Sequence, residues 1–238
     1  MVQNNYFRFM STIFFVVVIV GFGRSFYLKS YFDFPELSVY LYLHGIALSA
    51  WFTLALIQPW LIKSRRTKLH RKLGIVGVLL AVSVVVTGVL TVTLRDAPEI
   101  DEFPARAGGN LASLIMFASC VILAVWYRHK PDTHKRLMLL ASIPILAPAL
   151  DRLARIPVLN EFFGEVLFWF PEAPEVAFAT LGFLFLLLTV VVNDLIILRR
   201  IQQGTVLGLL AIFIISPVVT YAFLASGAWV TFVHWVAF

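Results

Sequence analysis

Residues 73–94 read LGIVGVLLAVSVVVTGVLTVTL, an apolar stretch without a single charged side chain. A helix needs about 20 apolar residues to cross the hydrocarbon core of a bilayer, so this stretch alone predicts a transmembrane helix. The rest of the chain has the same character, because 61% of the 238 residues are hydrophobic and only 13% are charged. A soluble domain is about half apolar and a quarter charged, so the composition predicts an integral membrane protein.

Seven apolar stretches are separated by charged or proline-rich breaks, and each is long enough or nearly long enough to span a membrane. The sequence therefore predicts a single transmembrane domain over residues 1–238, an all-α bundle of about seven helices. Between the fifth and sixth stretches, residues 156–174 mix aromatic and acidic side chains, which predicts an amphipathic segment on the outer surface. The stretches cover approximately residues 9–28, 37–62, 73–94, 109–127, 136–155, 175–198 and 205–236.

The connections between these stretches alternate in charge. Cytoplasmic loops retain Lys and Arg, so the basic connections mark the inner side, with the N-terminus in the cytoplasm and the C-terminus outside. This orientation places 13 of the 19 Lys and Arg residues inside, together with two of the 13 acidic residues. The net charge of +6 therefore indicates direction across a membrane, and no nucleic-acid partner is expected.

Several function classes are excluded by the residues present. Cys120 is the only cysteine, so one chain has neither a disulfide nor a cysteine-based metal cluster. No P-loop, GxSxG, HExxH or dinucleotide-binding glycine pattern occurs. The last apolar stretch has no lysine that could bind retinal, which excludes a rhodopsin.

The fifth apolar stretch contains Pro144 and Pro148. Each proline removes a backbone donor and clashes with the preceding turn, so a kink is expected there. Irregular backbone at membrane depth must be satisfied by protein or water. This helix is therefore predicted to line a cavity rather than to face lipid.

His70 and His134 begin alternate helices and, in the predicted topology, lie at the same cytoplasmic depth. Two imidazoles at one level can hold the iron of a b-type haem from opposite sides. Cations that could pair with the haem propionates follow directly in the sequence. They are Arg71, Lys72, Lys135 and Arg136.

Two other interpretations of the same histidines remain open. Asp194 lies at a similar depth at the end of the sixth helix, and two histidines with one carboxylate can bind a single non-haem iron, copper or zinc ion. Alternatively, His70 and His134 belong to basic clusters that bind lipid phosphate and hold no metal.

His44, Trp51 and Gln58 recur at seven-residue intervals and therefore share one stripe of the second helix. A polar stripe in an apolar helix indicates a face that looks into the bundle, where His44 either packs or handles protons. Gln58 is assigned to the cofactor site.

Asp151 and Arg152 end the fifth helix at the expected depth of His44, and a carboxylate beside an imidazole can form a proton relay or a polar substrate site. These two residues and His44 are the catalytic candidates. The alternative is that Asp151 only pairs with a nearby arginine, namely Arg95, Arg152 or Arg155.

The motifs that begin at His70 (HRKLG) and at His134 (HKRLM), together with His44 and Gln58 before them, resemble those of a widespread and largely uncharacterised bacterial family of multi-pass membrane proteins. The resemblance covers approximately residues 40–155. More distantly, the layout resembles the cytochrome b561-like four-helix core, in which alternate helices pair histidines around haem. This resemblance implies that His70 and His134 hold a haem on the cytoplasmic side of a bacterial inner membrane. The fourth helix has no histidine to pair with His44, so one centre is expected.

Three functional hypotheses follow. The leading one is a membrane redox protein with b-type haem that exchanges electrons with a quinol or another lipophilic molecule. The second is a non-haem metal oxygenase or hydrolase that acts on a lipid. The third is a transporter or ligand-binding protein without a metal, in which the broken fifth helix moves. All three place the protein in contact with membrane lipid, and a homo-oligomer is compatible with each.

Overall fold

The computed structural model describes residues 2–96, 105–159, 161, 174–228 and 231. Within these ranges the regular structure is helical and no strand is formed. Six helices are long and apolar enough to cross a membrane, and a shorter apolar helix, Asn5–Gly21, precedes them. The predicted all-α fold is therefore confirmed, and six candidate spans of the kind expected in a multi-pass membrane protein are present among the described residues. Its principal helices are α1 (Val2–Gly21), α2 (Val39–Lys63), α3 (Thr67–Asp96), α4 (Ala105–Trp126), α5 (Pro131–Ser142), α6 (Ala147–Ala154), α8 (Pro174–Leu198), α9 (Gln203–Leu210) and α10 (Ser216–Ala225).

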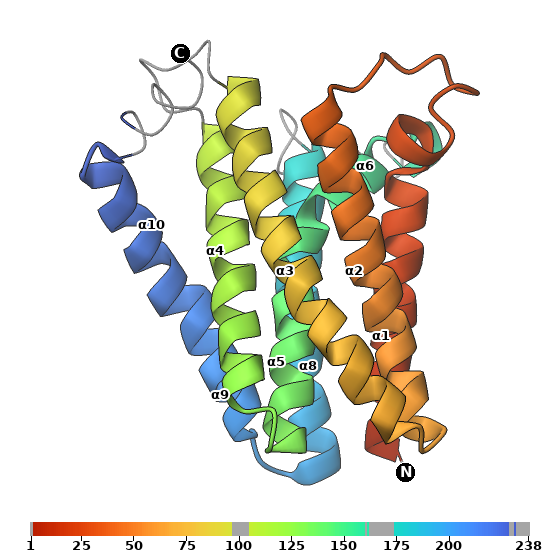
Figure 1. The fold of residues 1–238 in the computed structure, drawn as a ribbon, viewed down its shortest axis with the longest axis vertical. Helices are drawn as coiled ribbons and strands as arrows, with labels where there is room; N and C mark the ends of the chain where they lie inside the picture. The colour runs from red at the N-terminus through yellow and green to blue at the C-terminus, as the bar shows by residue number, and fades with distance from the viewer. Residues whose placement is uncertain (1, 97–104, 160, 162–173, 229–230, 232–238) are drawn as a thin grey trace.

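Most of the helices run close to the long axis of the bundle, and α3 crosses obliquely in front of the others (Figure 1). Along the chain, α2 packs against both α1 and α3, and α4 packs against α3 and α5. The last helix, α10, leans outward at the edge of the bundle and contacts α4. Successive helices are therefore mostly spatial neighbours, as expected where connections are short.

The fifth apolar stretch forms the centre of the bundle. It consists of α5, the short 3₁₀ turn η3 (Pro144–Leu146) and α6. Over its most apolar 18 residues 67% is buried, against 22% to 33% over the same length in the other five spans. The prolines impose the break, as the sequence predicts. The side chain of Trp51 packs beside the break and donates a hydrogen bond to Ser142 Oγ at 3.2 Å, and Pro144, Ile145 and Leu146 are buried.

The last described span is also irregular. Between α9 and α10 lies a π-helical turn, η4 (Ala211–Ile215), directly before Pro217. Ser216 Oγ donates to the carbonyl oxygen of Ala211 at 2.6 Å and so bonds a group in this widened turn. The regular α-helix is therefore interrupted at this turn. The predicted end of this span near residue 236 lies outside the described residues.

Two predicted boundaries need comment. The first helix begins at Val2 and its α-helical part ends at Gly21, earlier than the predicted 9–28, because a π-helical turn, η1 (Gly23–Tyr27), follows it. Most of the predicted amphipathic segment 156–174 lies outside the described residues.

Candidate functional site

His70 and His134 occupy equivalent positions in two helical hairpins. Each is the fourth residue of a helix that follows a short basic connection, His70 in α3 and His134 in α5. The two rings are near enough for a charge on one to act on the other. Both histidines therefore lie at the start of a helix, as predicted, and a charge on His134 is felt at His70.

The ring of His134 is held in one orientation by the backbone of α4. Its Nδ1 lies 2.8 Å from the carbonyl oxygen of Ala124. A carbonyl can only accept a hydrogen bond, so Nδ1 carries the proton and a neutral ring keeps its lone pair on Nε2. Metal-ligating histidines are commonly oriented in this way, with the second ring nitrogen bonded to a carbonyl or carboxylate.

His70 lies beside Gln58, which approaches it from the preceding helix. Gln58 Nε2 donates to the backbone carbonyl of His70 at 3.3 Å. Among the described residues, Gln58 Oε1 and His70 Nδ1 are buried without a hydrogen-bond partner. A buried polar atom left unpaired costs about 1–3 kcal/mol, so such atoms are uncommon and call for a partner from outside the chain.

The cations expected to surround a cofactor differ in their environment. Arg71 is exposed, and its charge acts on His70. Lys135 forms an ion pair with Asp132 at 2.6 Å, and its ammonium group lies 5.1 Å from the centre of the Phe7 ring. Lys135 is thus engaged within α5 and with α1.

Arg136 is fully buried and binds Asp194 rather than a cofactor. Its Nη2 and Nε lie 2.6 and 2.9 Å from Asp194 Oδ1, and Asp194 is also fully buried. The second carboxylate oxygen, Oδ2, accepts from Thr205 Oγ1 at 2.6 Å and from the Gln202 amide at 3.0 Å. Arg136 Nη1 donates to the carbonyl of Asp132 at 2.7 Å. We call these five residues the Arg136–Asp194 network; it links α5, α8 and the start of α9.

The network corrects the predicted non-haem metal site. Both oxygens of Asp194 are engaged by protein donors, so this carboxylate does not join His70 and His134. In the part of the chain that the structure describes, no group of three or more His, Cys, Asp or Glu side chains is placed to hold a metal ion.

His44 lies on the inward stripe of α2, as predicted, and its Nδ1 is 3.0 Å from Thr87 Oγ1. The Thr87 hydroxyl donates its proton to the carbonyl of Ser83 at 2.6 Å, so it accepts from Nδ1. The lone pair of a neutral His44 is therefore on Nε2. Gly88 makes room for the ring, since a Cβ there would lie 3.1 Å from His44 Cε1.

Asp151 and Arg152 have partners of their own near the end of α6. Asp151 pairs with Arg155, four residues later, at 3.1 Å. The Arg152 guanidinium lies 4.5 Å from the centre of the Phe22 ring and donates to the carbonyl of Pro148 at 3.0 Å. The pair with Arg155 is the local arginine pair that the sequence offered as the alternative to a proton relay.

Sequence reasoning missed two features. Thr205 was not singled out, although a hydroxyl close to a buried carboxylate is a frequent partner. Tyr6 was also missed; its hydroxyl lies 2.9 Å from Thr189 Oγ1 and ties α1 to α8. The available signal was the presence of single polar residues within otherwise apolar helices.

No family model, curated protein or solved structure matches this chain. The function has to be inferred from its own side chains.

Proposed function

We propose that this chain is a membrane redox protein in which His70 and His134 hold a b-type haem and exchange electrons with a quinol or another lipophilic molecule. The observation that carries the proposal is the Nδ1 hydrogen bond from His134 to the Ala124 carbonyl, which leaves Nε2 free as a ligand. His70, in the neighbouring hairpin, is not oriented in this way, but its buried Nδ1 has no hydrogen-bond partner among the described residues and is available to a ligand.

The residues fit such a group chemically. Bound haem supplies one-electron exchange, at a potential set by its ligands and surroundings. Ala124 orients the His134 ring, and Gln58 holds the first turn of α3 beside His70. Arg71 places an exposed cation at the site, suited to a propionate. His44, with its lone pair on Nε2, is assigned to proton handling elsewhere in the bundle.

The proposal includes a topology and a location. Counting α1 with the six long spans gives seven crossings, with the N-terminus and the basic connections in the cytoplasm of a bacterium. The alternation of basic and acidic connections supports this orientation.

The decisive experiment is redox difference spectroscopy on the purified protein. We expect haem bands in the wild type and their loss in His70→Ala and His134→Ala. The matched control is His129→Ala, because His129 is exposed in the connection between α4 and α5. Absence of haem from the wild type, or equal haem content in all three variants, overturns the proposal.

The same spectrum distinguishes the redox proposal from the alternative of a transporter or ligand-binding protein without a metal. A transporter without a metal predicts no haem bands and a ligand-dependent change in accessibility from both sides of the membrane. The Arg136–Asp194 network bears on that alternative, because it fixes the start of the central helix to α8 and α9.

A further inference from the structure

Two cations from different helices meet over one aromatic ring at the end of the bundle that carries the N-terminus (Figure 1). The ring belongs to Trp60 in the last turn of α2; Arg8 Cζ of α1 lies 5.0 Å from its centre, and Lys63 Nζ lies 5.3 Å from it. Since both groups are about 5 Å from the same point, their charges are no more than about 10 Å apart, a distance at which like charges still repel in dilute salt. We call these three residues the Trp60 cluster.

Lys63 forms no ion pair within the described part of the chain. The α2–α3, α4–α5 and α8–α9 connections lie at this end of the bundle (Figure 1). The acidic side chains described beside them are Asp132, which pairs with Lys135, and Asp194, which binds Arg136. These carboxylates are therefore engaged elsewhere, and an anion from outside the chain would lower the repulsion in the Trp60 cluster.

The Trp60 cluster lies where a candidate span ends. Val39–Lys63 is one of the six long apolar helices, and Trp60 is 46% exposed in its last turn. Tryptophan is enriched at the level of lipid headgroups, where its N–H meets polar groups and its ring meets hydrocarbon. One turn further into the span, Ile57 is exposed on the same side of α2, and Phe9 is exposed next to Arg8 on α1. Two cations, an indole N–H and apolar surface beside them fit a phosphate group that carries hydrocarbon chains.

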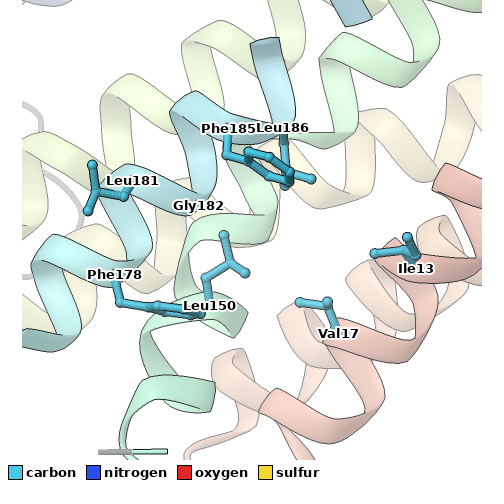
Figure 2. A pocket seen from close by; sticks show the side chains of 8 residues that line it. All are labelled: Ile13, Val17, Leu150, Phe178, Leu181, Gly182, Phe185 and Leu186. Atoms are coloured by element: carbon cyan, nitrogen blue, oxygen red, sulfur yellow. The ribbon is translucent and has the colours of Figure 1, made fainter. Parts of the chain in front are cut away.

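The opening between α1 and α8 has a different chemistry. Its lining consists of apolar side chains and one glycine, and Figure 2 shows Ile13 and Val17 facing Leu150 and α8. No charged or hydrogen-bonding side chain lines this opening, so its contacts do not distinguish one hydrocarbon chain from another. The Trp60 cluster, in contrast, can select a ligand by charge.

We propose that the Trp60 cluster binds the headgroup phosphate of an anionic phospholipid, with the acyl chains lying along the exposed sides of α1 and α2. Free phosphate offers the same charge, but only a lipid also covers the apolar surface at Ile57 and Phe9. A Lys or Arg close to an anionic membrane surface contributes about fivefold to affinity. The inference goes beyond the proposed function and does not depend on haem.

The test is titration of the purified full chain in a non-ionic detergent with phosphatidylglycerol or phosphatidylcholine of identical acyl chains, followed by native mass spectrometry. We expect phosphatidylglycerol to bind at least about fivefold more tightly, because only its headgroup carries a net negative charge. An excess of about tenfold of inorganic phosphate should not displace it, since phosphate alone buries no apolar surface.

A matched pair of variants tests the cluster itself. Lys63→Gln should weaken binding of phosphatidylglycerol about fivefold and leave that of phosphatidylcholine unchanged. Lys68→Gln is the control, because Lys68 is also exposed, at the start of α3, and does not lie over the Trp60 ring. It should leave both affinities unchanged. Trp60→Leu should weaken binding of both lipids, because the indole N–H that donates to the phosphate is lost.

Three results overturn the inference. They are equal affinity for the two lipids, equal effects of Lys63→Gln and Lys68→Gln, which would mark a diffuse attraction to the basic connection, and displacement by inorganic phosphate, which would mark a site for a free anion. His134→Ala separates the two proposals, because it removes a proposed haem ligand and should leave lipid binding intact. Selective lipid binding by a protein without haem would sustain this inference while the haem proposal fails.

Discussion

The Arg136–Asp194 network and the Gln58–His70 pair make an instructive contrast, because both place buried polar groups where helices begin or end. In the network, both carboxylate oxygens of Asp194 are bonded, and Arg136 is bonded through all three of its nitrogens. In the pair, Gln58 Oε1 and His70 Nδ1 are buried with no partner in the described part of the chain.

The difference separates stabilising polar groups from candidate functional ones. A buried charge pair is tolerated when geometry and additional hydrogen bonds compensate for its desolvation, which is the condition that the network meets. Unpaired buried atoms lower stability and persist where another requirement, such as ligand binding, maintains them. Mutations in the two regions should therefore have opposite effects on stability.

The largest effect is expected for Asp194→Ala. Removing the carboxylate leaves the fully buried Arg136 without its counter-charge, so the free energy of unfolding should fall by about 3–5 kcal/mol. The measurement is denaturant unfolding in micelles. Asp132→Ala is the control; its carboxylate is 68% exposed, and its loss should cost about 1 kcal/mol or less. Equal losses in the two variants would show that the buried pair contributes no more than a surface pair.

Thr205→Val should have an intermediate effect. The substitution keeps the shape of the side chain but removes the donor 2.6 Å from Asp194 Oδ2. A hydrogen bond to a charged group contributes about 1.5–3 kcal/mol, and the unfolding free energy should fall by that amount. Thr220→Val is the matched control, because Thr220 is also buried but donates only to the Ser216 carbonyl of its own helix. If Thr220→Val lowered the unfolding free energy as much as Thr205→Val, the effect would come from replacing a hydroxyl by a methyl group and not from the bond to Asp194.

Gln58→Leu should have the opposite effect and stabilise the protein. The change removes an unpaired buried oxygen at the cost of one long hydrogen bond of 3.3 Å, so the unfolding free energy should rise by about 1 kcal/mol. The same variant should lower haem content if Gln58 supports His70. Gln203→Leu, at an exposed position, should change stability by less than about 0.5 kcal/mol. A destabilised Gln58→Leu protein would contradict the contrast between the two regions.

The smallest effect is expected at the ion pair of Lys29 with Glu36, 2.5 Å apart outside the helical spans. The hydrogen bond from Lys29 lowers the pKa of Glu36 below 4.5. The pKa of Lys29 is raised above 10.5, first by its hydrogen bond to Glu36 and then by its hydrogen bond to Tyr42. The stabilisation by Glu36 is present above pH 4.5 and is lost as the pH falls through its lowered pKa. The stabilisation by Lys29 is present below pH 10.5 and is lost as the pH rises through its raised pKa.

The pH dependence of this pair is checked with Glu36→Gln. The small difference in Tm between wild type and variant should be constant near neutral pH and should vanish in acid. A difference that persists in acid would show that the variant acts through something other than this charge.

Much of the fold follows from the sequence, because hydrophobic stretches and prolines act locally. The apolar stretches place the spans, and the seven-residue spacing of Trp51 places it inside, where it is 2% exposed. The spacing of Asp151 and Arg155 likewise suits the local pair that forms.

The site was less predictable, because depth along a helix does not specify which neighbour a side chain faces. Arg136 belongs to a basic cluster typical of lipid contacts, yet it turns inward to Asp194, 58 residues later in the chain. The two helices involved are not consecutive, and only their packing decides that these charges meet. The equivalent positions of His70 and His134, each the fourth residue of its helix, were predictable because the two basic motifs recur in the sequence.

The burial of Arg136 has a consequence for how the protein is made. A positively charged side chain in a membrane helix is unfavourable until it is neutralised, and Asp194 is synthesised only after another 58 residues. The central helix is also among the least hydrophobic of the six spans, with a mean hydropathy of 1.6. Stable insertion of this helix therefore depends on α8 and the start of α9, so a chain truncated before α8 should leave it poorly integrated and open to proteolysis.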